Sequence, residues 1–301
     1  MSFTATTRQL TTLLANDVLS RLERMRLNPT RRLTNRTHGE HLSGKGGASI
    51  EFSDYRDYVA GDDLRNVDWN SFARLQRPYV KLYRHEEELH VVLLIDASSS
   101  MLHDRKFDRA RQLACAFGLM ALLNREKVSM YSCHHSGDQP VLLPPCTGRL
   151  SLRRTFEFLE GVEGGGDFPV ERAVEAVLRR HRGRGIAVLL SDFLTFGDLH
   201  RPLNLLYSAG LEIFAVQILS PTEIEPDVAG DLRFVDSETG QMLDVSSAGD
   251  LLSVYQDYRL GLARDLELQC RRRSGRFLSI SSHDPIEWVL FDLLRRRGWT
   301  R

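Results

Sequence analysis

Short apolar runs alternate with amphipathic segments from residue 89 to the end of the chain. The runs at 89–95, 186–190 and 211–219 contain few polar residues, which is typical of strands buried on both faces of a parallel sheet. Between these runs apolar residues recur every three or four positions. This spacing predicts helices at 107–124, 150–160, 169–181, 199–209 and 250–272. We therefore expect an α/β fold with a doubly wound, mostly parallel sheet.

The first 88 residues follow a different pattern. Apolar residues at helical spacing, from Leu10 to Met25, predict one amphipathic helix over 9–27. Residues 79–83 alternate between apolar and polar in the way of a strand. We predict an N-terminal helical and partly β arm at 1–88, followed by the α/β domain at 89–301. Prolines and glycines within about 221–247 indicate a hairpin excursion from that domain.

Composition and charge exclude several classes of protein. Lys+Arg and Asp+Glu both number 40, so no net field favours nucleic acid or an anionic membrane. The N-terminus lacks the apolar core of a signal peptide. The longest near-apolar run, at 113–123, is far shorter than the roughly 20 residues that a membrane span needs. We expect a cytoplasmic protein with no membrane span and no nucleic-acid partner.

The candidate chemistry lies where the first buried run ends. Asp96 closes the run, and Ser98 and Ser100 follow at a spacing of two. Three hard oxygen donors at the carboxyl end of a strand suit Mg²⁺ or Mn²⁺, which prefer oxygen ligands. The alternative is that Asp96 or one of the serines caps the next helix.

The second buried run ends in the same way, with Ser191 and Asp192. Parallel neighbouring strands would bring both aspartates to one edge of the sheet. Asp96, Ser98, Ser100 and Asp192 would then surround one divalent ion.

With these two strand ends, residues 89–301 resemble a von Willebrand factor A-like domain, which has Rossmann-like topology and a metal-ion-dependent adhesion site. That family supplies a threonine ligand from a middle loop that reads Gly-Gly-Thr-Asp-Leu. Here the loop reads Gly165-Gly166-Asp167-Phe168, so Gly166 stands in the place of the threonine. The resemblance thus implies a metal site with one hydroxyl fewer, for which Asp167 is a further candidate ligand.

A narrower resemblance, from about residue 38 onward, is to the bacterial DUF58 family. Its motifs are Gly39-Glu40-His41, Ser43-Gly44, Glu51-Phe52, Tyr55-Arg56-Asp57-Tyr58, the block 61–69 and Ala73-Arg74, followed by the Asp96–Met101 loop. Genes of this family typically lie beside those of MoxR-type AAA+ ATPases. The resemblance therefore implies such an ATPase as the partner, with this chain as its adaptor or co-chaperone.

The block 61–69 and its neighbours combine acids, arginines and a tryptophan. They form either a partner-binding surface or a structural network in which carboxylates hold guanidinium groups through paired hydrogen bonds. The residues concerned are Arg56, Asp62, Asp63, Arg65, Asp68, Trp69 and Arg74.

The function that these patterns favour is a non-catalytic protein-binding module. A divalent ion held by the strand-end residues would bind an acidic side chain of a client protein or of the ATPase. Two alternatives remain open. One is a metal-dependent phosphohydrolase, because two aspartates around Mg²⁺ support phosphoryl transfer. The other is a metal-free scaffold, in which Gly166 has abolished the ion.

Overall fold

The computed structural model describes residues 9–30, 34–35, 50–86, 89–133, 140–167, 170–194, 199–227, 230–235, 240–245 and 251–301. The chain forms two compact units, with boundaries after residues 31 and 89. The larger unit groups the N-terminal segment with residues 90–301, and the smaller unit spans residues 32–89.

The larger unit is built around a six-stranded sheet in the order β11-β8-β7-β4-β5-β6. All neighbouring strands are parallel except the edge pair β5 and β6, which is antiparallel. This confirms the expected mixed α/β fold with a mostly parallel sheet. The strands are β4 (His90–Asp96), β5 (Lys127–Cys133), β6 (Val141–Thr147), β7 (Gly185–Ser191), β8 (Leu211–Leu219) and β11 (Arg276–Ser281).

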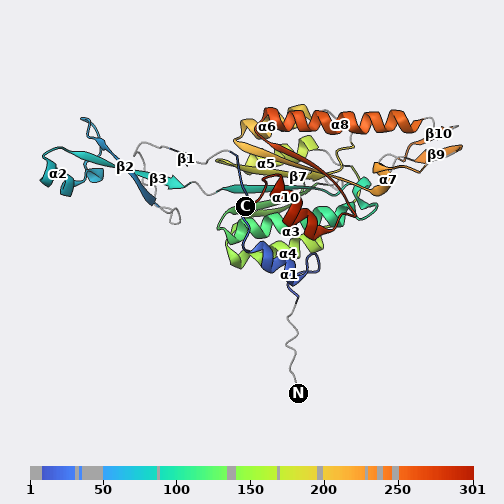
Figure 1. Ribbon diagram of the computed structural model, residues 1–301, viewed down its shortest axis with the longest axis horizontal. Helices are drawn as coiled ribbons and strands as arrows, with labels where there is room; N and C mark the ends of the chain where they lie inside the picture. The colour runs from blue at the N-terminus through green and yellow to red at the C-terminus, as the bar shows by residue number, and fades with distance from the viewer. Residues whose placement is uncertain are drawn as a thin grey trace, which may run out of the picture. The chain divides into compact units, whose positions relative to one another are not determined.

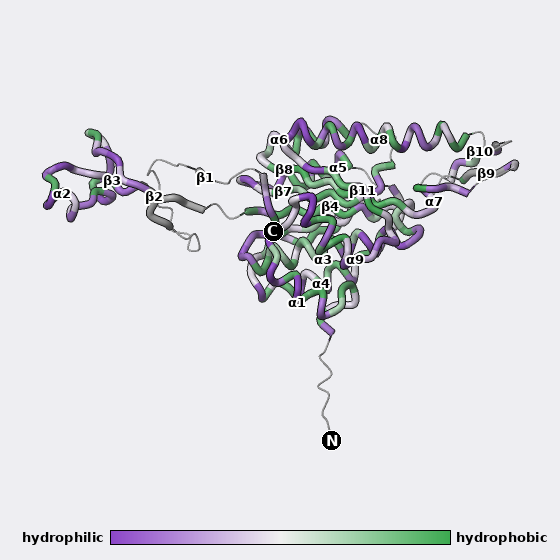
Figure 2. Tube along the Cα trace, in the orientation of Figure 1, coloured by the Kyte–Doolittle hydropathy of each residue, from purple (hydrophilic) through white to green (hydrophobic). Residues whose placement is uncertain are grey.

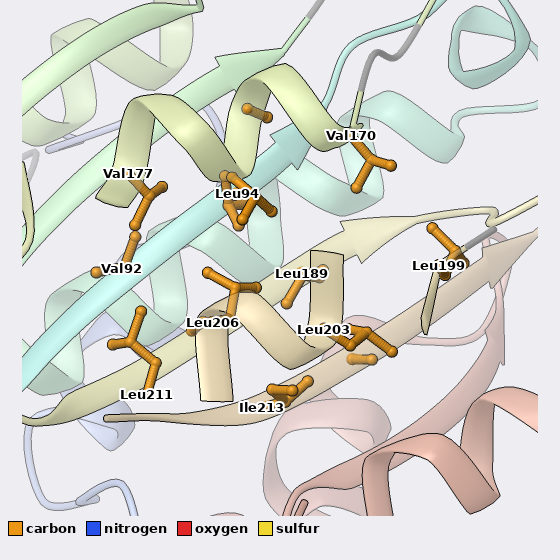
Figure 3. Packing of buried hydrophobic residues seen from close by; sticks show 14 of the residues in the cluster. Val92, Leu94, Val170, Val177, Leu189, Leu199, Leu203, Leu206, Leu211 and Ile213 are labelled. Carbon is orange, nitrogen blue, oxygen red and sulfur yellow. The ribbon is translucent and has the colours of Figure 1, made fainter. Parts of the chain in front are cut away.

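The central position of β4 explains its apolar sequence. It pairs with β5 on one side and with β7 on the other, and all seven of its residues are buried. Val92 and Leu94 pack into a cluster with Leu189 and Ile213 from neighbouring strands and with Leu206 from a covering helix (Figure 3). Helices cover both faces, so neither face of the strand needs polar side chains.

Helices cover the sheet on both sides (Figure 1). On one face lie α5 (Val170–Arg180), α6 (His200–Ser208) and α8 (Leu252–Arg272), and each contributes buried residues to the cluster of Figure 3. On the other face lies α3 (Lys106–Leu123), with α1 (Asn16–Leu22) and α4 (Leu152–Gly161) packed against it. Because α3 is sandwiched between these layers, most of its residues are buried.

Hydropathy follows this arrangement (Figure 2). The strands of the sheet are largely hydrophobic, whereas α8 alternates between hydrophobic and hydrophilic residues along its length. Its buried residues Leu266 and Cys270 face the sheet, and Val254 and Tyr258 are exposed. Among the described residues, no helix has the length and apolar character that a membrane crossing requires.

The N-terminal segment differs from the sequence prediction. The helix predicted over 9–27 is confined to Asn16–Leu22, and Leu10 is exposed. The Glu160 carboxylate accepts hydrogen bonds from the Thr12 amide and from the hydroxyls of Thr11 and Thr12. These tertiary contacts hold the first residues in a non-helical conformation while Leu13 and Leu14 remain buried.

The remaining elements of the larger unit follow the expected order. After α7 (Pro221–Ile224), the strands β9 (Leu232–Val235) and β10 (Met242–Val245) form the antiparallel hairpin expected within 221–247. The C-terminal helix consists of α9 (Ile286–Trp288), a π-helical turn (Val289–Leu293) and α10 (Leu294–Arg296).

The smaller unit contains a three-stranded antiparallel sheet in the order β1-β3-β2. Its elements are β1 (Thr34–Asn35), β2 (Ile50–Asp57), a short 3₁₀ helix (Leu64–Asn66), α2 (Trp69–Leu75) and β3 (Tyr79–Glu86). The family motifs between Gly39 and Gly44 lie outside the described residues.

Candidate metal site at the carboxyl edge of the sheet

The register of the sheet brings the ends of β4 and β7 together. Ile95 pairs with Leu190 across two parallel strands, so Asp96 and Ser191 end at the same edge. The Ser191 hydroxyl donates to Asp96 Oδ2 at 2.5 Å, and the Ser98 amide donates to Asp96 Oδ1 at 2.9 Å. Both carboxylate oxygens of Asp96 are therefore held by fixed donors.

The four residues singled out from the two strand ends lie together. Ser98 Oγ is 3.0 Å from Ser100 Oγ, and the Ser100 hydroxyl donates to Asp192 Oδ2 at 2.9 Å. The other oxygen of Asp192 accepts the Leu194 amide at 3.1 Å. We call Asp96, Ser98, Ser100 and Asp192 the carboxyl-edge cluster. Asp96, Ser98 and Asp192 are buried, and Ser100 is partly exposed.

The middle glycine loop lies directly against this cluster. The Gly165 amide donates to the Ala97 carbonyl at 2.7 Å, and the Ser99 amide donates to the Gly166 carbonyl at 2.8 Å. A Cβ atom on Gly164 would lie 2.9 Å from the Ala97 carbonyl oxygen, so this close approach requires glycine. Asp167, the further candidate ligand, is exposed in the same loop.

Two residues that the sequence analysis did not single out complete the surroundings. Lys106, the first residue of α3, is fully buried, and its ammonium donates to Asp192 Oδ2 at 2.8 Å. The same ammonium forms a salt bridge with Glu223 of α7. Glu223 is in turn fixed by a capping box, in which its Oε2 accepts the Ser220 amide and its own amide donates to Ser220 Oγ.

Burial and charge set the protonation of these groups. Burial and the nearby Asp192 carboxylate raise the pKa of Asp96, although the hydrogen bonds from Ser191 and Ser98 act in the opposite direction. Burial lowers the pKa of Lys106, but Asp192 and Glu223 more than compensate, so the pKa lies above its ordinary value. Lys106 is therefore a permanent buried cation beside the cluster.

The donor set fits a hard divalent cation in its chemistry. It offers two carboxylates and two hydroxyls, all oxygen donors of the kind that Mg²⁺ and Mn²⁺ prefer. Gly166 contributes no side chain where the adhesion-site pattern has threonine. Among the described residues, no three His, Cys, Asp or Glu side chains are grouped so as to hold a metal. An ion here would therefore depend on Ser98, Ser100 and water as well as on the two aspartates.

The first part of the acid- and arginine-rich block forms an ion pair within the smaller unit. The Arg56 guanidinium donates two hydrogen bonds to Asp62, at 2.7 and 2.8 Å, in a bidentate arrangement. Asp62 also accepts the Val59 amide at 2.9 Å, which fixes the turn after β2. This pair has the geometry expected of a structural network.

Asp68 serves as the N-cap of α2. Its carboxylate accepts the amides of Asn70 and Ser71 and the hydroxyl of Tyr55, and Lys81 Nζ lies 3.5 Å away. The Tyr55 hydrogen bond, together with those from Ser71 and Asn70, lowers the pKa of Asp68 to about 2. Asp68 therefore stabilises the start of the helix as a carboxylate.

The other residues of the block lie at the surface of the smaller unit. Asp63 accepts the Arg65 amide and caps the 3₁₀ helix, while the side chains of Arg65 and Arg74 are exposed. Trp69 is 56% exposed and packs edge-to-face with Phe72. The block thus combines structural contacts with an exposed aromatic and basic surface.

The sequence contains a signal for each of the two residues, Lys106 and Glu223, that the sequence analysis did not single out. Ser220 and Glu223 stand at capping-box spacing, which marks the start of the short helix α7 at Pro221. Lys106 is one of only four lysines, with Lys45, Lys81 and Lys127, among 40 basic residues. Neither signal reveals that Asp192 and Glu223 both accept from the Lys106 ammonium, because these contacts join residues that are 86 and 117 positions apart in the chain.

Comparisons with solved structures find distant similarity. BatB from Bacteroides thetaiotaomicron is 14% identical, with a TM-score of 0.41 over 64% of this chain and 90% of that one. An aerotolerance-related membrane protein from Bacteroides fragilis is 16% identical, with a TM-score of 0.39 over 64% and 91%.

Comparisons of sequence find closer relatives. Uncharacterized protein Rv1480 of Mycobacterium tuberculosis and uncharacterized protein Mb1516 of Mycobacterium bovis are each 32% identical over 293 residues. Each alignment covers 92% of this chain and 89% of the relative. The family described as "Protein of unknown function DUF58" matches residues 54–259. On this match and these relatives, the chain belongs to the DUF58 family.

Proposed function

We propose that this chain is a protein-binding module whose carboxyl-edge cluster holds Mg²⁺ or Mn²⁺ and thereby binds an acidic side chain of a partner. The observation that carries the proposal is the convergence of Asp96, Ser98, Ser100 and Asp192 from two strand ends far apart in the chain. These residues would hold the ion, and the ion would supply a positively charged contact for a carboxylate.

The charges around the cluster support a divalent cation. Asp96, Asp192 and Glu223 would carry three negative charges when ionised, and Lys106 supplies one positive charge. The deficit of two positive charges equals the charge of Mg²⁺ or Mn²⁺. Burial and, second, the nearby Asp192 carboxylate raise the pKa of Asp96, and the contribution of Asp192 is consistent with this deficit.

The chemistry of the ion supports an acidic partner. Mg²⁺ usually keeps several positions for water or for oxygen ligands from another molecule. Ser100 is the partly exposed member of the cluster, which gives an incoming carboxylate a route to the ion. More specifically, we propose that residues 89–301 are a von Willebrand factor A-like domain and that the ion occupies its adhesion site.

The partner that we propose is a MoxR-type AAA+ ATPase, with this chain as its adaptor or co-chaperone and with an acidic client as a second ligand. The support is the family match over residues 54–259, together with the resemblance to DUF58 proteins, which implies such an ATPase as the partner. The exposed surface around Trp69, Arg65 and Arg74 offers a second contact in the smaller unit.

Metal binding is tested by calorimetric titration of the purified full chain with Mn²⁺. We expect the wild-type chain to bind one ion and Asp192→Asn to lose most of that affinity. The matched control is Asp108→Asn, an acid near the start of α3 that pairs with Arg111 outside the cluster. If the wild-type chain binds no Mn²⁺, or if both variants bind equally well, the metal proposal is wrong.

Partner binding is tested by capture of a purified MoxR-type ATPase on the immobilised chain, with Mg²⁺ or with EDTA. We expect retention with Mg²⁺ and release with EDTA, and loss of retention in Asp96→Ala. Retention that is indifferent to EDTA and to Asp96→Ala would instead indicate a metal-free scaffold.

A further inference from the structure

Lys106 is the one lysine whose side chain is completely buried in the part of the larger unit that the structure describes. Lysine is among the residues least often buried without a partner, because its ammonium must leave water. Here Asp192 and Glu223 both accept from the ammonium. The side chain extends from the first residue of α3 and ends beside the proposed metal ligand Asp192.

The ammonium and the cluster use the same carboxylate oxygen. Asp192 Oδ2 accepts the Ser100 hydroxyl at 2.9 Å and the Lys106 ammonium at 2.8 Å. An ion bound by Ser100 and Asp192 would therefore lie close to a fixed positive charge. The two cations would repel each other and share the charge of one carboxylate.

The ammonium is not free to withdraw from this position. Glu223, its second acceptor, is held by the Ser220 capping box, and the Glu223 carbonyl accepts the Tyr255 hydroxyl from α8 at 2.9 Å. Burial on all sides further restricts the Lys106 side chain. Its charge is therefore a constant feature of the site, whether or not a divalent ion is bound.

We propose that Lys106 is a built-in counter-cation that weakens divalent-ion binding at the carboxyl-edge cluster, so that firm binding requires the additional negative charge of an acidic partner. Lys106 thereby determines the affinity of the site without being a ligand. This inference rests on the proposed metal-binding function and adds a control of its affinity.

The test is Mn²⁺ titration of full-length Lys106→Met, which keeps the length of the side chain and removes its charge. We expect the affinity for Mn²⁺ to rise by about tenfold or more, because a repelling charge is removed at short range. A purely structural role would lower the affinity or leave it unchanged. The control is Lys127→Met, which alters a lysine at the start of β5, at the opposite edge of the sheet, and should leave the affinity at the wild-type value.

Lys106→Gln serves as a second variant if Lys106→Met does not fold, because its amide can still donate to Asp192 and Glu223. A rise in affinity in either folded variant supports the inference. Folded variants that bind Mn²⁺ no more tightly than the wild-type chain overturn it, even where the wild-type chain binds. Absence of Mn²⁺ binding both in the wild-type chain and in the folded Lys106 variants would overturn the proposed function as well.

Discussion

The two ends of strand β4 both bury polar side chains, but they satisfy them in opposite ways. At the amino end, His90 and His181 lie stacked with their ring centroids 5.0 Å apart. At the carboxyl end, Asp96 and Asp192 share a buried site with the Lys106 ammonium. One end contains a neutral hydrogen-bonded chain, and the other contains a group of interacting charges.

The neutral end is fully paired when both imidazoles are uncharged. The Gly183 carbonyl can only accept, so His181 Nε2 donates to it at 2.9 Å. His181 Nδ1 then accepts from His90 Nδ1 at 3.0 Å. His90 Nε2 in turn accepts the Ser129 hydroxyl at 2.9 Å. Every ring nitrogen has a partner, and no charge is required.

The charged end lacks such a balance. Burial and Asp192 together raise the pKa of Asp96, so the site disfavours its own ionised form. With neutral or apolar groups in these buried positions, the fold would be at least as stable as it is with the charged groups. Under the proposed function, the charged groups at the carboxyl edge serve ion binding, and the contrast with the neutral amino edge is consistent with that proposal.

The largest effect is expected from Asp192→Ala, measured by urea unfolding in EDTA. The change removes an acceptor of Lys106, Ser100 and the Leu194 amide, and leaves the Lys106 ammonium with Glu223 alone. Breaking a buried ion pair in this way should destabilise the fold by about 3 kcal/mol, after relief of the repulsion on Asp96. The control Asp244→Ala removes an exposed pair with Arg233 and should leave the unfolding midpoint unchanged.

If the two variants differ little in stability, the charged end is no more tightly organised than the surface. The comparison between the two ends would then lose its basis.

The amino end predicts a loss of stability in mild acid. Burial, His181 and Lys127 lower the pKa of His90 from 6.5 to about 3, and burial also lowers the pKa of His181, with smaller effects from Lys127 and Arg182. Both imidazoles are therefore neutral in the folded chain but become protonated in the unfolded chain below their ordinary pKa. Their stabilisation is complete above about pH 6.5 and is lost progressively as the pH falls toward about 3.

This loss is measured as the difference between wild-type and His181→Gln unfolding free energies, from about pH 7.5 to about pH 5.5. Each imidazole should account for about 1 kcal/mol of the decrease in the unfolding free energy of the wild-type chain over this pH range. The unfolding free energy of His181→Gln, which lacks one of the two imidazoles, should therefore decrease by about 1 kcal/mol less. The control His283→Gln removes an exposed imidazole and should follow the wild-type curve. Equal slopes for wild type and His181→Gln would show that the amino end is not a neutral pair.

The sequence predicted the sheet well because its signal is local. Buried strands such as β4 and β8 consist mostly of apolar residues, so their presence and their approximate bounds follow from the run of residues. The convergence of Asp96 and Asp192 required only that two such strands be parallel neighbours. The N-terminal helix was predicted too long because Glu160, which holds Thr11 and Thr12, is distant in sequence.

The parts of the site that the sequence could not supply depend on side-chain contacts over long range. The pairing of Lys106 with Glu223 joins the start of α3 to α7. The local sequence around either residue does not indicate that the other is its partner. Likewise, His90 and His181 stand at opposite ends of unrelated segments until the fold stacks them. Such contacts decide whether a buried edge is charged or neutral, and they are therefore visible only in three dimensions.

The smallest effect compares two buried serines, one at each edge of the sheet. The Ser191 hydroxyl donates to the Asp96 carboxylate, whereas the Ser129 hydroxyl donates to a neutral imidazole. Hydrogen bonds to charged groups contribute about 1.5–3 kcal/mol to stability and neutral ones about 1 kcal/mol, so Ser191→Ala should destabilise the fold about 1 kcal/mol more than Ser129→Ala. Both serines are buried, but Ser191→Ala also removes the acceptor of the Phe193 amide, so the difference in urea midpoint is an upper bound on the effect of the acceptor's charge. Equal losses would mean that Asp96 is protonated when it accepts from Ser191, and the carboxyl end would then be as neutral as the amino end.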